Sequence, residues 1–212
     1  VESPQAERLP LAFLGHGLAF DPRDPCRVAV FEKKGPGACL VDLRQRKLIQ
    51  AIPTKSTRHF YGHGAFSADG ALLYATESLL DQARNGVLVI RDGQTLRELG
   101  TLPTHGTAPH DCLILADGCT MVVANGGGAL GEAEPCVTYI DLKSEALLDR
   151  VPLSSSRFNA GHIALSRRGD LAIVSAPRDG LSPQDLGAVT LRPAGGAAIT
   201  VSKPAHAIRR MI

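Results

Sequence analysis

Apolar residues in this chain form short runs separated by turn-forming residues. In the stretch RHFYGHGAFSADGALLYATE, which begins at Arg58, the runs Ala65–Ser67 and Leu72–Thr76 flank the dipeptide Asp69-Gly70. Asp-Gly between two apolar runs is a strong hairpin signal, because glycine readily takes the positive φ that such turns need. The pattern predicts an extended loop from Arg58 to Gly64, followed by a β-hairpin.

The same arrangement occurs three more times, each copy with a histidine just before an apolar run. The other copies are LGHGLAFDPRDPCRVAVFE, PHDCLILADGCTMVVAN and GHIALSRRGDLAIVSA. The separations are 47 residues from His16 to His63, 47 from His63 to His110 and 52 from His110 to His162. A period in the forties filled with strands and turns is typical of four-stranded propeller blades.

A second predicted hairpin follows each histidine hairpin and ends near a proline. We therefore predict an all-β protein, a β-propeller of four-stranded antiparallel blades, with no helix of ten or more residues. About four blades fit this chain, at residues 15–54, 62–104, 109–153 and 161–204. Residues 205–212 would start a further blade, and residues 9–14 would be the outer strand of a preceding one. The chain opens without Met and stops where a strand is expected, so we expect a fragment of a longer propeller.

The segments that differ most between the units connect the second and third strands of each. They are EKKGPG, ESLLDQARN, NGGGALGEAE and PRDGLSPQDL. In a propeller these loops lie on one rim, and loops held by a rigid scaffold are where binding residues tend to collect.

The recurring histidines are the first candidates for chemistry. The first strand of a propeller blade lies beside the central channel, so His16, His63, His110 and His162 would form an arc at one mouth of it. Converging imidazoles suit Cu, Zn, Fe or Ni. The alternative is structural: each ring would hydrogen-bond the backbone of a neighbouring blade and hold the blades in register. Repetition itself favours this second interpretation.

A further candidate cluster precedes the second histidine. Arg58, His59 and Tyr61 have no counterpart in the other units. A guanidinium and an imidazole beside an aromatic ring would hold an anionic ligand through charge-assisted hydrogen bonds. A surface cluster with Arg58 stacked on Tyr61 is an equally good interpretation.

Two histidines and a carboxylate also lie close together in the third unit. His105 and the pair His110-Asp111 fall within a few residues. Asp111 would either orient a metal-ligating histidine or bond its own loop backbone. The nearby Asn125-Gly126-Gly127-Gly128 is not a phosphate loop, because no Lys-Ser/Thr follows it.

Composition narrows the choice of partners. The net charge is +2, and no basic block or long apolar run is present, so neither nucleic acid nor a membrane span is expected. The five cysteines form no CxxC pair and are read as mostly small buried hydrophobic residues. In the third hairpin, a turn at Asp117-Gly118 places Cys112 opposite Val123 and not opposite Cys119.

The strings RHFYGHGAFSADGALLYATE, LPTHGTAPHDCLILADGCTMVVANGG and TYIDLKSEALLDRV resemble one family, over about residues 12–165. It is an exported β-propeller family of unknown function, whose genes often neighbour imelysin-like and di-haem thiol-oxidoreductase-like iron-uptake proteins in Gram-negative bacteria. Its members resemble seven-bladed propellers of the lactonase and haem-d1 nitrite-reductase type and usually carry a twin-arginine export signal. This chain shows no such signal, is too short for seven blades, and has ALGEAE where the family has a longer insertion.

The resemblance implies a periplasmic protein. Asn125, in the VVANGG string, is a further candidate ligand-binding residue. We expect a non-catalytic binding or scaffold protein in iron or other metal handling, with Fe or Cu as the candidate metal. One alternative is a lactonase-like hydrolase with a general base among His59, His105 and Asp111. Another is an interaction platform for a periplasmic redox or imelysin-like iron-uptake partner.

Overall fold

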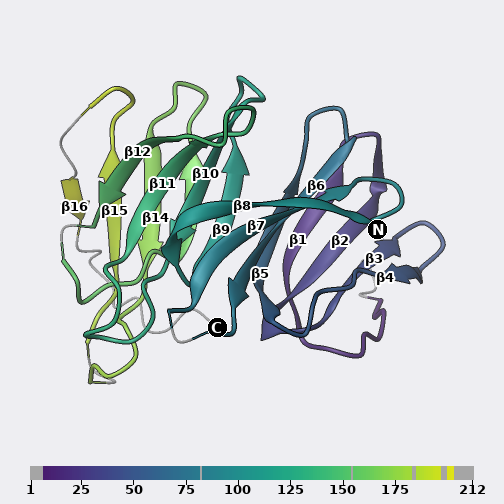
Figure 1. The fold of residues 1–212 in the computed structure, drawn as a ribbon, viewed down its shortest axis with the longest axis horizontal. Coiled ribbons are helices and arrows are strands. Elements are labelled where there is room, and N and C mark those ends of the chain that lie inside the picture. Colours follow the sequence, from purple (N-terminus) through teal and green to yellow (C-terminus); the bar gives the residue numbers. More distant parts are fainter. Residues whose placement is uncertain (1–6, 82, 154, 183–184, 197–199, 203–212) are drawn as a thin grey trace, which may run out of the picture.

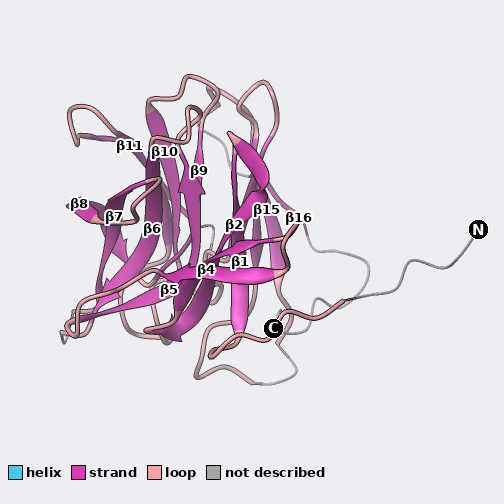
Figure 2. Cartoon of the chain, turned by 90° about the vertical axis from the view of Figure 1, so that its right-hand side faces the viewer, coloured by secondary structure: helices cyan, strands magenta, loops and turns pink. Residues whose placement is uncertain are grey.

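Every regular element in the described part of the chain is a β-strand (Figure 2). The computed structural model describes residues 7–81, 83–153, 155–182, 185–196 and 200–202. These residues include no helix, so the all-β prediction is confirmed for this part of the protein. No helix long and apolar enough to cross a membrane is found among these residues.

The strands follow one another as sets of four (Figure 1). The first set consists of β1 (Gly15–Asp21), β2 (Asp24–Gly35), β3 (Ala38–Asp42) and β4 (Lys47–Ala51). The second set consists of β5 (Arg58–Phe66), β6 (Leu72–Leu79), β7 (Asn85–Asp92) and β8 (Glu98–Thr107). The third consists of β9 (Pro109–Ile114), β10 (Thr120–Asn125), β11 (Cys136–Asp141) and β12 (Leu147–Pro152). The fourth consists of β13 (His162–Leu165), β14 (Leu171–Ser175), β15 (Ala188–Arg192) and β16 (Thr200–Ser202).

Within each set every strand pairs antiparallel with the next in sequence. The third and fourth sets are separate four-stranded sheets. The first two sets are joined into one eight-stranded sheet, because β2 runs on past β1 and pairs with β5 at Lys33↔Tyr61 and Gly35↔Phe60. Figure 1 shows β1–β4 toward one end of the molecule and β10–β16 toward the other, with β7, β8 and β9 meeting near its middle. The division of the chain into blades stays a prediction.

The hydrophobic core lies in layers between neighbouring sheets, and the third set shows why. Along β10, Met121 and Val123 point into a layer shared with the second set. The alternate residues Val122 and Ala124 point into a layer shared with the fourth set. All four side chains are fully buried, so this strand is hydrophobic on both faces and reads as a continuous apolar run. A sheet covered on both faces depends on its neighbours for stability.

Two strand predictions are corrected. The segment from Arg58 to Gly64 is part of β5 and not a loop, because it pairs with the long end of β6, as at Arg58↔Leu79. Residues 9–14 form no strand. Leu9, Leu11 and Phe13 instead pack on an apolar cluster of the first sheet through their side chains alone. Residues 205–212, expected to begin another blade, lie outside the described residues.

The cysteines behave as expected in the hairpin of β9 and β10. Cys112 lies opposite Val123, as the turn position predicts. All five cysteines are free thiols, and Cys39, Cys112 and Cys136 are buried. Burial raises the pKa of the Cys112 thiol well above its usual value, so that side chain is a small apolar core residue.

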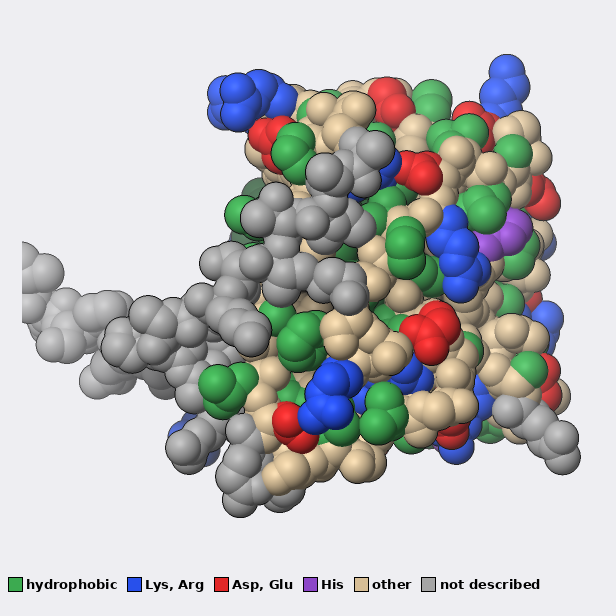
Figure 3. Space-filling model, turned by 90° about the vertical axis from the view of Figure 1, so that its left-hand side faces the viewer, with side chains coloured by type: hydrophobic (Ala, Val, Ile, Leu, Met, Phe, Trp, Pro, Cys, Tyr) green, Lys and Arg blue, Asp and Glu red, His purple; other side chains and the backbone are tan. Residues whose placement is uncertain are grey.

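The face of the molecule on the side of β15 and β16 has a mixed surface. Figure 3 shows acidic, basic and hydrophobic side chains interspersed there, around atoms of the residues that are not described. The visible part of this face has no large area of a single charge.

Candidate metal site

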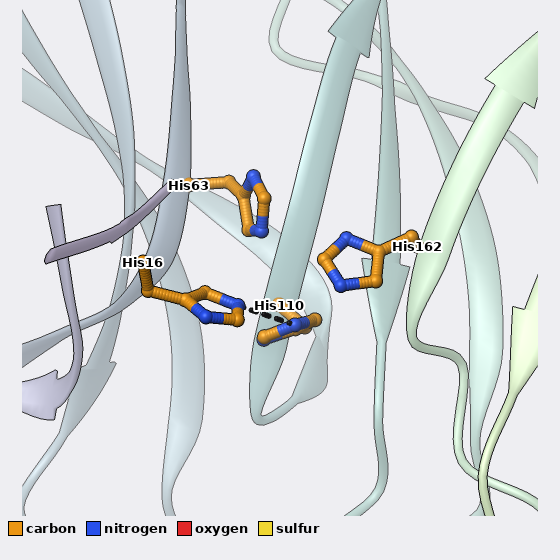
Figure 4. Close-up of side chains that lie close together, drawn as sticks. All are labelled: His16, His63, His110 and His162. Atoms are coloured by element: carbon orange, nitrogen blue, oxygen red, sulfur yellow. Dashed lines mark hydrogen bonds between the residues drawn. The ribbon is translucent and has the colours of Figure 1, made fainter. Parts of the chain in front are cut away.

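The first strands of the four sets bring the four repeated histidines to one place. His16 is the second residue of β1, His63 lies on β5, His110 on β9, and His162 opens β13. Their side chains point toward one another (Figure 4), and one ring nitrogen from each lies within 4.8 Å of the corresponding atom of every other. We call these four residues the histidine cluster. In the described part of the chain, no other group of three or more His, Cys, Asp or Glu side chains has this metal-ligand arrangement.

The spacing of the rings suits a shared ion. The Nε2 atoms of His16 and His110 are 3.3 Å apart, and ring centroids in the cluster are separated by 4.8 to 5.7 Å. Two nitrogens at adjacent vertices of a tetrahedron, each about 2.0–2.1 Å from a metal ion, are roughly 3.4 Å apart. The closest pair already has that spacing, and the wider pairs need to approach by about 1 Å.

The hydrogen bonds of the rings decide which nitrogens are available. The Nδ1 atom of His110 lies 3.0 Å from the carbonyl oxygen of Tyr61. A carbonyl only accepts, so Nδ1 carries the proton and Nε2 of His110 presents its lone pair to the cluster. Nε2 of His63 is buried and has no hydrogen-bond partner. A metal ion shared with the other three rings would satisfy this nitrogen, whereas Nε2 of His105, which is likewise buried without a partner, lies outside the cluster.

Asp111 lies behind two of the rings. Its Oδ1 is 3.5 Å from Nδ1 of His63, and its Oδ2 is 3.8 Å from Nδ1 of His162. The same carboxylate accepts hydrogen bonds from the backbone N–H groups of Cys112 and Ile163. Asp111 therefore bonds backbone N–H groups, and its two oxygens also lie beside Nδ1 of two rings, at ion-pair distances rather than at close hydrogen-bond distances. A carboxylate behind a ligating histidine is the usual way of orienting the ring.

The electrostatics keep three rings of the cluster neutral and the carboxylate of Asp111 charged. Burial, together with the charges of His63 and Lys33, lowers the pKa of His16 to about 4. Burial and the same two neighbours lower the pKa of His110 to about 3. Burial also lowers the pKa of His63, although Asp111 opposes it. For Asp111, burial would raise the pKa, but the bond to His162 and the charge of His63 hold it below its ordinary value. At neutral pH these imidazoles are therefore in the form that binds metals.

Two glycines make room for the rings. A Cβ on Gly17 would lie 2.8 Å from Nδ1 of His63 and 2.0 Å from the carbonyl oxygen of Gly62. A Cβ on Gly62 would lie about 3 Å from the rings of His110 and His16, and its φ of +131° also favours glycine. Sequence reasoning passed over both residues, although the repeated Gly-His-Gly strings of the first two units contain them.

Arg58 lies in a different environment from the exposed rim that was expected. Its side chain is 5 % exposed and pairs with Glu77 at 3.0 Å and with Glu98 at 2.6 Å. Glu77 is fully buried and also pairs with Arg91, at 2.6 Å. Tyr61 has Lys34 above its ring, 5.7 Å from the centroid, in the position predicted for Arg58. Arg58 is thus held inside the protein by its own carboxylate partners.

The remaining candidate residues lie outside the histidine cluster. His59 is on β5 and is partly buried, and His105 is on the outer strand β8. Asn125 is fully buried, and its amide donates to Thr138 at 3.0 Å. Gly106 packs against Asn125 so closely that a Cβ there would lie 2.4 Å from its side chain. The structure thus brings together the four histidines and Asp111, as the sequence predicted. It places His59, His105 and Asn125 outside this cluster.

Comparisons with known proteins give a family and a fold. Residues 9–211 match the model of a family described as "Protein of unknown function (DUF1513)". No curated protein matches the chain. Among solved structures, Kuenenia stuttgartiensis hydrazine synthase is similar with a TM-score of 0.56 at 15% identity, covering 98% of this chain and 71% of that one. A chain of a mitotic checkpoint complex is similar with a TM-score of 0.66 at 15% identity, covering 98% of this chain and 60% of that one.

Both structural neighbours are propeller-type proteins, and at this level of identity the likeness concerns the fold alone. The propeller-like character of the chain therefore rests on its packed antiparallel sheets together with these neighbours. The chain spans well under the full length of either neighbour.

Proposed function

The chain belongs to the DUF1513 family of unknown function, and we propose that it binds one first-row transition-metal ion through His16, His63, His110 and His162. The observation that carries this proposal is the convergence of four imidazoles whose ligand atoms lie within 4.8 Å of one another. Three further features support it: the buried Nε2 of His63 without a partner, the carboxylate of Asp111 behind two rings, and the lowered pKa values of three rings.

The structural interpretation of the histidines explains less of this geometry. Among the four described rings, His110 is the one with a hydrogen bond to a backbone carbonyl of a neighbouring set, that of Tyr61. That bond uses Nδ1 and leaves Nε2 directed at the cluster. A role in holding the sheets in register does not require the four rings to share one point.

The donor set favours copper over iron. Four neutral nitrogen ligands suit Cu(II), which also binds more tightly than Fe(II) to a given site in the Irving–Williams order. Fe(III) is a harder ion and prefers oxygen ligands. We therefore propose copper as the metal bound most tightly, and Fe(II) as the weaker second choice.

We further propose that this metal centre serves metal handling in the periplasm, with an iron-uptake or redox protein as partner. The support is the resemblance of the FYGHG, THGTAPHD and VVANGG strings to the exported propeller family.

The lactonase-like alternative has less support from the geometry. His59 and His105 lie outside the cluster, and Asp111 is engaged by two backbone N–H groups, so these residues do not form one catalytic group.

The test is metal content of protein purified without a histidine tag. After loading with Cu(II) and dialysis, we expect one copper per wild-type chain and an electron paramagnetic resonance spectrum with nitrogen ligands. His63→Ala and His110→Ala should retain less than a tenth of that copper. His59→Ala and His105→Ala are matched controls, since they remove imidazoles outside the cluster, and should retain all of it. Equal and negligible copper in all five proteins would remove the proposal.

A further inference from the structure

A cavity of about 300 Å³ lies where the loops between the second and third strands meet. Each of the four sets contributes to it. Lys33 and Lys34 come from the end of β2, Arg84 from the loop before β7, Gly128 from the loop after β10, and Arg178 from the loop after β14. The expectation that these variable loops share one place is confirmed by this lining.

The cavity adjoins the histidine cluster. His110 and His162 line it, and so does Tyr61, whose carbonyl oxygen fixes the ring of His110. A molecule in the cavity would therefore contact two rings of the cluster.

The lining carries a clear excess of positive charge. It holds four cationic side chains, those of Lys33, Lys34, Arg84 and Arg178, against the carboxylate of Asp179. Among the described residues, none of the four cations forms an ion pair with a carboxylate, although other arginines of the chain do. Partial desolvation and the neighbouring charge of Lys34 lower the pKa of Lys33, although Asp179 opposes this, and both lysines are exposed at the cavity.

Arg178 contributes charge from beneath the surface. Its side chain is 3% exposed and donates to the backbone carbonyls of Gly127, Gly128, Ala129, Ala133 and Ser156. These bonds hold the loop after β10 in place, and they satisfy the guanidinium without neutralising it. A buried cation next to a cavity attracts an anion more strongly than an exposed one, because water screens it less.

The size of the cavity limits the ligand. About 300 Å³ is at the lower end of the range for organic ligands, roughly 300–1,000 Å³, and exceeds what a single inorganic oxyanion needs. The lysines come from the end of β2 and Arg84 from the loop before β7, so the cations reach the cavity from two different sets of strands. This arrangement suits a small molecule with two or more separated negative groups.

We propose that this cavity binds a small organic polycarboxylate, held by Lys33, Lys34 and Arg84, against the face of the histidine cluster. The binding does not require a metal ion, so it goes beyond the proposed metal function and can be tested without it.

The experiment is calorimetric titration of metal-free, untagged protein with citrate as the probe, at low and at physiological ionic strength. We expect one site per chain, with binding that weakens as salt rises. The double variant Lys33→Gln/Lys34→Gln should bind citrate at least tenfold more weakly, and Arg84→Gln should also weaken it. The double variant Lys47→Gln/Lys143→Gln is the control, because it removes the same charge from exposed positions elsewhere.

Two further probes test the ligand class. Acetate, with one charge, and inorganic phosphate, which is smaller than the cavity, should each bind at least tenfold more weakly than citrate. Equal citrate affinity in the two double variants would overturn the proposal, and so would phosphate binding as tightly as citrate. A parallel copper measurement on Lys33→Gln/Lys34→Gln should give the wild-type content, so loss of the metal site and loss of the anion site are told apart.

Discussion

Two buried polar clusters share strand β5 and are built on opposite plans. The first is the Glu77 network, which consists of Arg58, Glu77, Arg91 and Glu98, and its charges pair with one another at 2.6 to 3.0 Å. The guanidinium of Arg91 also lies over the Phe60 ring, 5.3 Å from its centroid. The second is the histidine cluster, in which four like groups face one another and Asp111 is the single carboxylate behind them.

The difference separates a structural group from a binding site. The charges of the Glu77 network pair with one another inside the protein, so the network needs no ligand to neutralise it, although Nε of Arg58 and Nε and Nη1 of Arg91 make no hydrogen bond. The histidine cluster leaves nitrogen lone pairs directed at a common point, and one of them, on His63, is buried without a partner. The first cluster should therefore govern stability, and the second should govern what the protein binds.

The largest effect is expected in the Glu77 network. Glu77→Gln preserves the shape of the side chain but leaves Arg58 and Arg91 as buried cations without their shared partner. Breaking a buried pair in this way costs about 3–5 kcal/mol, which should lower the midpoint of thermal unfolding by roughly 10 °C for a chain of this size. Copper content should not change.

Glu98→Gln is the matched control for this variant. The Glu98 side chain is 26 % exposed, and its partner Lys55 is largely in solvent, so the loss should be about 1 kcal/mol or less. Equally small shifts in both variants would contradict the structural role assigned to Glu77. Loss of copper in Glu77→Gln would show that the two clusters are not independent.

A smaller effect, on copper affinity rather than on stability, is expected from a substitution at Asp111. Asp111→Asn removes the negative charge behind His63 and His162 and puts a neutral amide beside their Nδ1 atoms. Losing a partner of this kind typically lowers metal affinity 10- to 100-fold. Competition with a copper chelator would measure it, with Asp117→Asn, a turn residue of the neighbouring hairpin, as control. Wild-type copper affinity in Asp111→Asn would show that the carboxylate serves the backbone alone.

The sequence could predict the histidine cluster because a repeat makes one position equivalent in every unit. Each histidine lies on the first strand of its set, so the regular spacing of His16, His63 and His110 implies equivalent places around a common centre. Asp111 could be predicted as part of this site because it directly follows His110 in the sequence. Hairpin register was accessible too, since a turn at Asp117-Gly118 fixes which residues face each other.

The buried ion pairs of Arg58 could not be predicted from the repeat. Its partners Glu77 and Glu98 are far away in sequence, and neither stands at a repeated position. Arg58 is also five residues from His63, and a bulge between Phe60 and Gly64 in β5 shifts the register between the two. The cavity was hidden for a related reason: Lys33, Arg84 and Arg178 come from loops whose sequences share no pattern, and they meet only in the folded chain.

The smallest effect is expected in the acid sensitivity of the metal-free protein. The pKa of His110 is lowered by burial from 6.5 to about 3, so the unfolded chain takes up a proton below pH 6.5 while the folded chain does not. Stability should therefore fall as the pH drops from 6.5, by about 1 kcal/mol by pH 5.5 from this residue, and continue to fall toward pH 3. His16 adds to the loss, less strongly because it is more exposed. Urea unfolding at pH 7, 6.5 and 5.5 measures the slope, which should be shallower in His110→Ala. A slope unchanged by that substitution would mean that the His110 ring is not held neutral in the folded protein. The contrast between the histidine cluster and the ion-paired Glu77 network would then lose its electrostatic basis.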